Sequence, residues 1–436
     1  METISRAERQ PASAALPSTW KRAVTSPLWI AGVALVLRLA WIVIGHTYKF
    51  KPAPYNFNFG WEMGGIGASI ASGQGFGNPF GPTTGPTAWE PPMYPYLTAL
   101  VFLAFGIYSK ASAIVLLSLN SLFSALTCIP IFFIARRIFS SRVAIVSAWA
   151  WALLPNVITW CTRWVWETSL SALLLALAVW LALALEELEG FKWWGSFGLL
   201  WGAIALNGTS MLAFLPAAGL WAWYRRARCG RRSLAGVGLA SLVFLASISP
   251  WLVRNYRTLG RFIFIRDNFA AELRLGNGEG ASGTIMDYLD PPHDPYAMRQ
   301  FLEMGELEYI AMRQQQALDY IRADYSRFAR LSLKRLVYFW AGAPKGSESW
   351  GLSQAKNSLF LASSVLALWG LVRALRLRKP GAWLLFWLIL LYPLVYYIVY
   401  PGARYRQPIE PVMTILAVFL LTESGENPAT SPPDQS

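Results

Sequence analysis

The stretch YNFNFGWEMGGIGASIASGQGFGNPFGPTTGPTAWEPPMYP, residues 55–95, follows the first strongly apolar segment of the chain and precedes most of the others. It is rich in glycine, proline and aromatic residues, and its only carboxylates are Glu62 and Glu90. A connection of this length is usually functional or disordered, and its aromatic residues argue against a solvated tail. We therefore expect an ordered loop, with Glu62 at the centre of an active site that faces away from the cytoplasm.

The composition of the 436-residue chain predicts a polytopic membrane protein. Charged residues make up only 14% of the chain, whereas soluble domains contain about 25%. The net charge of +14 could indicate nucleic acid binding, but the arginines flank apolar segments, as membrane topology requires. We therefore expect membrane lipids and no nucleic acid as partners.

Cysteine and histidine are too sparse to organise the fold. Cys128, Cys161 and Cys229 lie in or beside different apolar segments and show neither disulfide nor metal spacing. The only histidines are His46 and His293, so a histidine-based zinc site is not expected.

The apolar runs predict an all-α fold with about ten or eleven transmembrane helices, because a spanning helix needs about 20 mainly apolar residues. The expected spans are 27–46, 112–134, 143–159, 166–185, 194–207, 209–224, 234–252, 358–374, 381–399 and 408–422. The pair 194–207 and 209–224 is interpreted as a tight hairpin or as one broken element. The run 94–107 is short, and a full crossing there stays open. The ends, 1–26 on the cytoplasmic side and 423–436, are expected to be disordered.

Clusters of basic residues set the expected topology. They lie at 21–22, 136–142, 225–232 and 373–379, and all can be cytoplasmic if 94–107 makes no independent crossing. The first loop, 47–93, and the long segment 253–357 are then extracytoplasmic. They divide the chain into an N-terminal transmembrane module, 27–252, an external loop, 253–357, and C-terminal helices, 358–422. Helical periodicity in the later part of 253–357 predicts amphipathic helices on the outer interface.

Two carboxylates of the first loop are candidates for chemistry. Glu62 precedes a predicted short helix, and desolvation near the bilayer boundary would raise its pKa, which suits a general base for a hydroxyl acceptor. The alternative is an interfacial glutamate that caps the helix. Glu90 lies in Trp89-Glu90-Pro91-Pro92, where a rigid turn with an exposed glutamate is the favoured interpretation.

Other ionisable groups fall at span ends or inside a span. Arg163 and Glu167 either shape the same external cavity or form a local ion pair at helical spacing. Arg38 lies near the middle of the first span and is a site hypothesis by default, with Glu62 or another carboxylate as its partner.

Arginines on the expected outer face indicate a phosphate. They are Arg254, Arg257, Arg261, Arg266, Arg404 and Arg406. Guanidinium groups bind phosphate bidentately, so a phosphate carried on a lipid would explain them, and anchoring to anionic headgroups is the alternative. The sequence lacks GxxxxGK[ST], a metal-binding Asp-x-Asp, HExxH and GxSxG, so the activated donor must come from elsewhere.

The order and spacing of several weak motifs resemble a known family. The motifs are Glu62 after the first span, Pro91-Pro92-Met93-Tyr94-Pro95, Ala135-Arg136-Arg137-Ile138-Phe139, Leu154-Pro155, Glu167, Pro250-Trp251 through Arg257, and Arg404-Tyr405-Arg406. Together they resemble the C-type polytopic glycosyltransferases that use polyprenyl-phosphate sugars, such as protein O-mannosyltransferases and the lipid A aminoarabinose transferase.

The resemblance implies an extracytoplasmic active site in a multi-pass protein of the bacterial inner membrane. It assigns the catalytic role to Glu62, although the family usually has aspartate there, and it places Glu167 near the site. Arg404, Tyr405 and Arg406 would bind the donor phosphate, with Arg254, Arg257 and Arg163 nearby. Some relatives bind a divalent metal near these acids, but this sequence offers no clear ligand set.

We therefore expect an inverting transfer of a sugar from a polyprenyl phosphate to an acceptor hydroxyl on a lipid, glycan or protein. Glu62 would take the hydroxyl proton, and the arginines would stabilise the departing phosphate. A polytopic transporter or lipid flippase is the alternative, since broken spans and an intramembrane arginine also fit that class. A non-catalytic assembly scaffold is a third interpretation.

Overall fold

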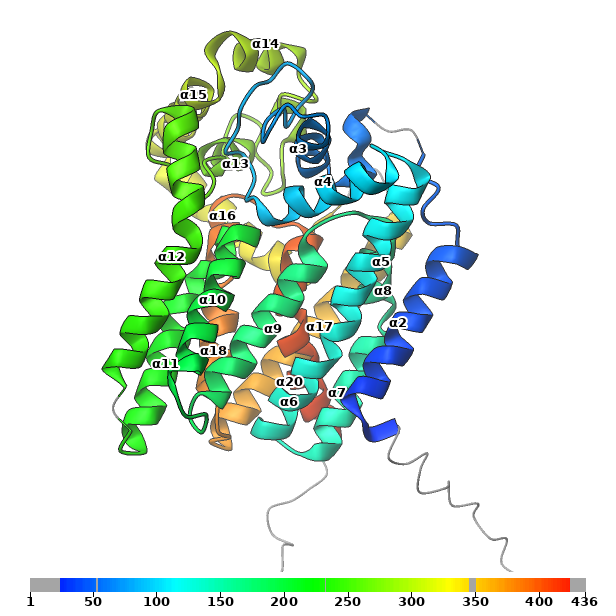
Figure 1. The fold of residues 1–436 in the computed structure, drawn as a ribbon, viewed down its shortest axis with the longest axis vertical. Coiled ribbons are helices and arrows are strands. Elements are labelled where there is room, and N and C mark those ends of the chain that lie inside the picture. Colours follow the sequence, from blue (N-terminus) through cyan, green and yellow to red (C-terminus); the bar gives the residue numbers. More distant parts are fainter. Residues whose placement is uncertain (1–23, 52–53, 232, 345–349, 424–436) are drawn as a thin grey trace, which may run out of the picture.

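The computed structural model describes residues 24–51, 54–231, 233–344 and 350–423 (Figure 1). Most of the two ends expected to be disordered lies outside these residues. The described parts of the chain form helices and turns, with one isolated bridge between Gly77 and Pro86. The expected all-α fold is confirmed.

The lower part of the molecule is a bundle of roughly parallel helices (Figure 1). Its elements are α2 (Pro27–Ile44), α5 (Lys110–Leu126), α6 (Cys128–Ile138), α7 (Ser141–Leu153), α8 (Pro155–Arg163), α9 (Thr168–Ala184), α10 (Phe191–Asn207), η2 (Thr209–Phe214), α11 (Leu215–Arg228), α12 (Leu234–Leu259), α17 (Trp350–Arg376), α18 (Ala382–Leu391), α19 (Leu394–Ile398), η4 (Ala403–Ile409) and α20 (Glu410–Thr422). Every apolar run expected to span the membrane falls on one or two of these helices.

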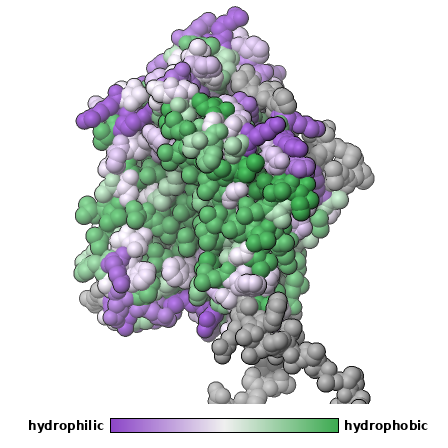
Figure 2. Space-filling model, turned by 45° about the vertical axis from the view of Figure 1, so that its right-hand side comes forward, coloured by the Kyte–Doolittle hydropathy of each residue, from purple (hydrophilic) through white to green (hydrophobic). Residues whose placement is uncertain are grey.

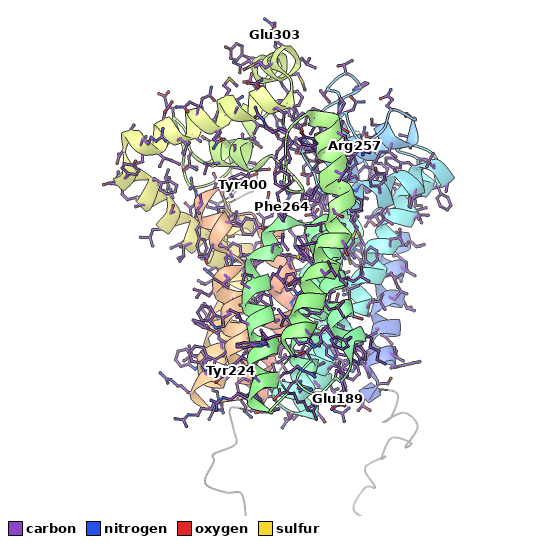
Figure 3. The ribbon with its side chains drawn as sticks, turned by 60° about the vertical axis from the view of Figure 1, so that its left-hand side comes forward. Glu189, Tyr224, Arg257, Phe264, Glu303 and Tyr400 are labelled. Carbon is purple, nitrogen blue, oxygen red and sulfur yellow. The ribbon has the colours of Figure 1, made fainter. Side chains whose placement is uncertain are left out.

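A second layer covers one end of the bundle (Figures 1 and 3). It contains η1 (Pro54–Phe59), α3 (Glu62–Ala71), α4 (Met93–Phe105), α13 (Phe269–Gly276), η3 (Asp287–Leu289), α14 (Pro295–Met304), α15 (Glu306–Ala323) and α16 (Tyr325–Ala341). Segments 47–93 and 253–344 therefore meet in one layer. The helices expected in the later part of the long segment are present.

Four described helices are long and apolar enough to cross a membrane, and the bent pair α7–α8 adds a fifth. Several bundle helices are shorter than 18 residues, such as α10 with 17 and α20 with 13. The expected ten or eleven spans remain a prediction. Helix α4, which covers the run 94–107, lies across the end of the bundle (Figure 1).

The run 194–224 forms a hairpin. Helix α10 ends at Asn207, and α11 returns to the end of the bundle at which α10 began. Two contacts with the connection before α10 show this return: Arg225 Nη2 lies 2.6 Å from Glu186 Oε1, and Arg226 donates to the Leu185 carbonyl at 2.8 Å. The broken-element alternative is therefore excluded.

Arg38 has a structural role in the bundle, which corrects the site hypothesis. The α7–α8 pair bends by 47° at Leu154–Pro155, and proline cannot donate to the carbonyl one turn earlier. The buried Arg38 donates to the carbonyls of Ala152 and Ala34, both at 3.0 Å, and of Trp151 at 3.2 Å. In the described chain its partners are carbonyls and a serine hydroxyl, and no carboxylate pairs with it.

The two ends of the molecule are polar and the band between them is apolar (Figure 2). The basic clusters gather at the end away from the second layer, where Figure 3 labels Glu189 and Tyr224. Arg137 binds Glu187 there at 3.0 Å, and Lys379 lies 3.4 Å from Glu423. The end that carries the first loop is therefore opposite the basic end.

Candidate active site

Glu62 is the first residue of α3, and a tight turn before it sets its position. Gly60 has φ +90°, and a Cβ there would lie 2.4 Å from the Val165 carbonyl oxygen. Trp61 adopts φ +52°, a conformation that costs energy for a residue with a side chain. The Val165 amide donates to the Asn58 carbonyl at 3.0 Å. The turn directly before Glu62 therefore packs against the connection between α8 and α9.

Glu62 interacts electrostatically with three charged groups from other segments of the chain. Burial raises the pKa of Glu62 well above its usual value, and the nearby carboxylates Glu90 and Asp290 raise it further, whereas Arg404 lowers it. These groups come from α3, from the end of the first loop, from the turn after η3, and from η4. The tertiary fold thus brings distant residues to Glu62.

Glu90 is buried, and the exposed turn expected for it is wrong. Its relative exposure is 7%, and an oxygen lies 3.6 Å from Arg266 Nη1. Burial raises the pKa of Glu90 to about 7, although Arg266 favours the ionised form. Local sequence suggested a solvent-exposed turn, but the segment around Arg266 covers it. Glu90 is thus a site residue, a role that the favoured interpretation of the sequence did not give it.

A network of side chains holds Arg266 against Glu90. Arg266 Nε donates to Asn268 Oδ1 at 2.6 Å, and its Nη2 lies 3.9 Å from Glu272 Oε1. Asn268 also donates to Glu272 at 3.1 Å, and the Tyr400 hydroxyl donates to the other Glu272 oxygen. Asn268 and Glu272 follow Arg266 closely in the chain, whereas Glu90 and Tyr400 come from distant segments.

Glu167 directly precedes α9 and faces this cluster. Its Oε2 is buried and accepts no hydrogen bond from the described residues, and its charge raises the pKa of Glu90. Arg163 ends α8 and is exposed, and Trp164 is extended (φ −132°, ψ 140°). The local ion pair is therefore wrong, because the helix is broken between its two members. Glu167 lies at the site, and Arg163 points to solvent.

Arg404 is the cation next to these acids. Its guanidinium lies between the rings of Trp166 and Tyr405, at 4.4 and 4.9 Å from their centroids, and donates to the Tyr405 hydroxyl at 3.1 Å. Burial opposes its charge, but Tyr405 and Glu167 raise the pKa of Arg404 above its usual value. Arg404 thus stays cationic beside Glu62, as an anion-binding residue must.

Arg406 does not face this cluster, so the expectation that it binds the donor phosphate is not met. It donates to Glu410 at 2.5 Å, Ser364 at 2.7 Å and Ser363 at 2.8 Å. These partners lie on α17 and α20, and Arg406 is 2% exposed. Arg406 therefore joins two bundle helices.

Arg254 and Arg257 differ in their contacts, although both were expected to bind the donor. Arg254 donates to the carbonyls of Thr87 and Phe76, both at 2.6 Å, and so clamps the first loop onto α12. Arg257 is exposed and makes no hydrogen bond or ion pair with any described residue. Of the expected phosphate-binding residues, Arg404 and Tyr405 are the ones placed beside Glu62.

Two further acids fasten the loop that carries Glu90. Glu306, at the start of α15, accepts from the Ala88 amide at 2.6 Å and from the Thr87 hydroxyl. Burial raises the pKa of Glu306 to about 8 and that of Asp267 to about 6. The Asp267 amide donates to the Ala88 carbonyl at 3.1 Å. The Glu306 carboxylate and the Asp267 backbone amide therefore hold the residues just before Glu90.

Segment 287–294 brings Asp290 and His293 to the segment that carries Glu62. Asp290 is buried, and burial together with Glu272 raises the pKa of Asp290 to about 8. The ring of His293 lies 4.8 Å from that of Trp61. No three His, Cys, Asp or Glu side chains within the described ranges form a metal-ligand set. The residues present therefore do not fit a metal centre.

An apolar groove of about 720 Å³ is lined by residues that follow two of these acids in the chain. Its walls come from α4, α5, α9, α10 and α12, and it begins at Pro92, two residues after Glu90, and at Leu170, one turn into α9 after Glu167. Arg254 lies at its edge. A charged cluster next to an apolar groove suits a molecule with a polar head and a hydrocarbon tail.

Comparison with known proteins finds one matching family. Residues 89–253 match the family described as dolichyl-phosphate-mannose-protein mannosyltransferase. No curated protein sequence matches the chain closely enough to count as a relative.

Comparison with solved structures gives matches of different strength. The oligosaccharyltransferase of Archaeoglobus fulgidus, solved with zinc and sulfate, has a TM-score of 0.52 and 15% identity over 90% of this chain. The apo form of the same enzyme has a TM-score of 0.51 and 14% sequence identity over 91% of this chain. ArnT from Cupriavidus metallidurans, bound to undecaprenyl phosphate, has a TM-score of 0.42 and 13% sequence identity. The match covers 93% of this chain and 78% of ArnT.

The chain spans about half the length of the oligosaccharyltransferase, covering 48% and 50% of the two forms. The family match over 89–253 includes Glu90 and Glu167, and the fold similarity extends over most of the chain. Together they confirm the expected resemblance to the C-type polytopic glycosyltransferases.

Proposed function

We propose that this chain is a membrane glycosyltransferase that moves a sugar from a polyprenyl-phosphate donor to an acceptor hydroxyl. The observation that carries the proposal is the convergence of Glu62, Glu90, Glu167 and Arg404 beside an apolar groove. The description of the matching family, which names a dolichyl-phosphate sugar, supports a lipid-linked donor. The cluster lies at one end of the bundle, which suits an enzyme better than a transport site at the midplane.

Each part of the donor has a counterpart in this arrangement. The polyprenyl chain would lie in the groove between α4, α9 and α12, where it replaces lipid contacts. The phosphate would bind Arg404, whose guanidinium lies against the rings of Trp166 and Tyr405. The sugar would then lie among Glu62, Glu90 and Asp290.

Glu62 is assigned as the general base. It would take the acceptor proton as the hydroxyl oxygen bonds to the anomeric carbon and the bond to phosphate breaks, which inverts that carbon. The carboxylates that raise its pKa make Glu62 a stronger base, while Arg404 favours the ionised form that the step requires. Arg404 would stabilise the charge of the departing phosphate.

The test measures transfer of radiolabelled sugar from polyprenyl phosphates by the protein in lipid nanodiscs. E62Q is expected to lower the rate about a hundredfold or more, the loss typical of removing one such group. E303Q, on the exposed surface of α14 (Figure 3), is the control and should keep the rate. Full transfer by E62Q would refute the base assignment, and no transfer from any polyprenyl-phosphate sugar would refute the donor class.

We further propose that the second layer faces outward from a bacterial inner membrane. Cys229 is exposed at the basic end, and the other two cysteines are buried. A membrane-impermeant maleimide should label Cys229 only after the membrane is opened, and an added cysteine at Glu303 should be labelled in intact spheroplasts. The reverse pattern would invert the topology.

A further inference from the structure

The four arginines of segment 254–266 divide into two groups. Arg254 binds carbonyls of the first loop, and Arg266 binds Glu90. Arg257 and Arg261 are exposed, and neither makes a hydrogen bond or ion pair within the described part of the chain. Arg254 and Arg266, the inner pair, belong to the site. Arg257 and Arg261, the outer arginines, have no protein partner among the described residues.

Exposed aromatic side chains accompany the outer arginines. Phe262 is 65% exposed and Phe264 45%, whereas Ile263 and Ile265 are 6% and 0% exposed. Tyr256, at the end of α12, is 60% exposed. The alternation buries the isoleucines and directs the phenylalanines away from the protein. We call residues 256–264 the aromatic–arginine turn.

Contacts with α12 hold the turn in one conformation. The chain reverses at Gly260, with φ +72°, and Ile265 adopts φ +62°, which is rare for a β-branched residue. The Ile265 carbonyl accepts from Trp251 Nε1 at 2.8 Å and from Asn255 Nδ2 at 3.1 Å. The protein therefore keeps two large apolar side chains on its surface in a fixed position.

The level of the turn along α12 indicates what covers it. Helix α12 has 26 residues and begins at Leu234, directly after the basic end. At about 1.5 Å per residue, Trp251 and Asn255 lie about 26 and 32 Å from Leu234, and a hydrocarbon core is about 30 Å thick. Phe264 thus lies at the far boundary of the core, and in Figure 3 it is closer to the bundle than Arg257.

We propose that the aromatic–arginine turn is a docking surface for the lipid leaflet on the side of the candidate site. Phe262 and Phe264 enter the edge of the hydrocarbon, and Arg257 and Arg261 bind lipid phosphates above it. Aromatic rings favour this boundary, and each basic residue near an anionic surface adds attraction. The surface is independent of the transfer reaction.

The test places a fluorescent probe on single cysteines at positions 262 and 264 in a C229S background. Tyr296, 66% exposed on α14 at the top of the second layer, provides the control position. In nanodiscs, lipids with a doxyl group near the headgroup should quench the probes at 262 and 264, and aqueous iodide should quench the probe at 296. Quenching of 262 and 264 by iodide alone, or by neither reagent as under a protein partner, would overturn the proposal.

A second arm tests the charges. With the probe at 264, anionic phosphatidylglycerol in a phosphatidylcholine nanodisc should increase doxyl quenching, and R257A/R261A should remove that increase. The matched control R299A/R322A changes two exposed arginines of the second layer and should keep it. Equal behaviour of the two pairs would refute the role of the turn's arginines.

Discussion

Arg266 should control the charge of Glu90. At 3.6 Å, two unit charges interact by on the order of 4 to 5 kcal/mol at an effective dielectric constant of about 20. Solvent reaches a quarter of the Arg266 side chain, and Glu272 competes for the guanidinium. We therefore expect R266M to remove about 1.4 kcal/mol of the interaction that stabilises ionised Glu90. That is a tenfold change in the proton-binding constant of Glu90.

The direction of the pKa shift of Glu90 follows from the removal of a cation. Glu90 has a pKa of about 7, so half of it is ionised at neutral pH. Without Arg266 the ionised form loses its partner and the pKa rises further, which lowers the ionised fraction at pH 7 to about one tenth. Ionisation of Glu90 in R266M should therefore require higher pH.

Infrared difference titration of the protonated carboxyl band measures this directly, without a transfer assay, and loss of the band in E90Q assigns it to Glu90. R266K, which keeps a positive charge, is the matched control and should titrate closer to the unmodified protein. A band in R266M that titrates as in the unmodified protein would refute the ion pair.

Three further predictions concern stability. Gly60→Ala should lower the melting temperature more than Gly73→Ala, because both have positive φ but only Gly60 meets a carbonyl, at 2.4 Å; equal losses would contradict the close approach. R38M should lower the unfolding free energy by about 3 kcal/mol in chemical denaturation, because buried carbonyls lose a charged donor; a neutral effect would exclude the capping role. Glu306 has a folded pKa of about 8 against about 4.3 unfolded, so the folded state holds more protons between these values. The melting temperature should therefore fall as the pH rises across that window, and E306Q should flatten the slope.

The groups that surround Glu62 were only partly predictable. Glu167 and Arg404 stand near the ends of apolar runs, where a charge is conspicuous in sequence, and Glu62 is one of two carboxylates in the first loop. Glu90 looked like an exposed turn because its neighbours are prolines, and its burial depends on residues 266–272, far away in the chain. Asp290 and Tyr400 had no local pattern that could identify them.

The sequence by itself determined the helical class, the places of the apolar helices and the loop that carries Glu62. Those features follow from local hydrophobicity and from the length of a helix. Only the tertiary structure decided which charged side chains serve the site. Arg404 lies between Trp166 and Tyr405 beside the acids, whereas Arg406, two residues later, is enclosed by α17 and α20. The physical reason is that the direction and burial of a side chain depend on the elements packed against it, and these come from distant parts of the chain.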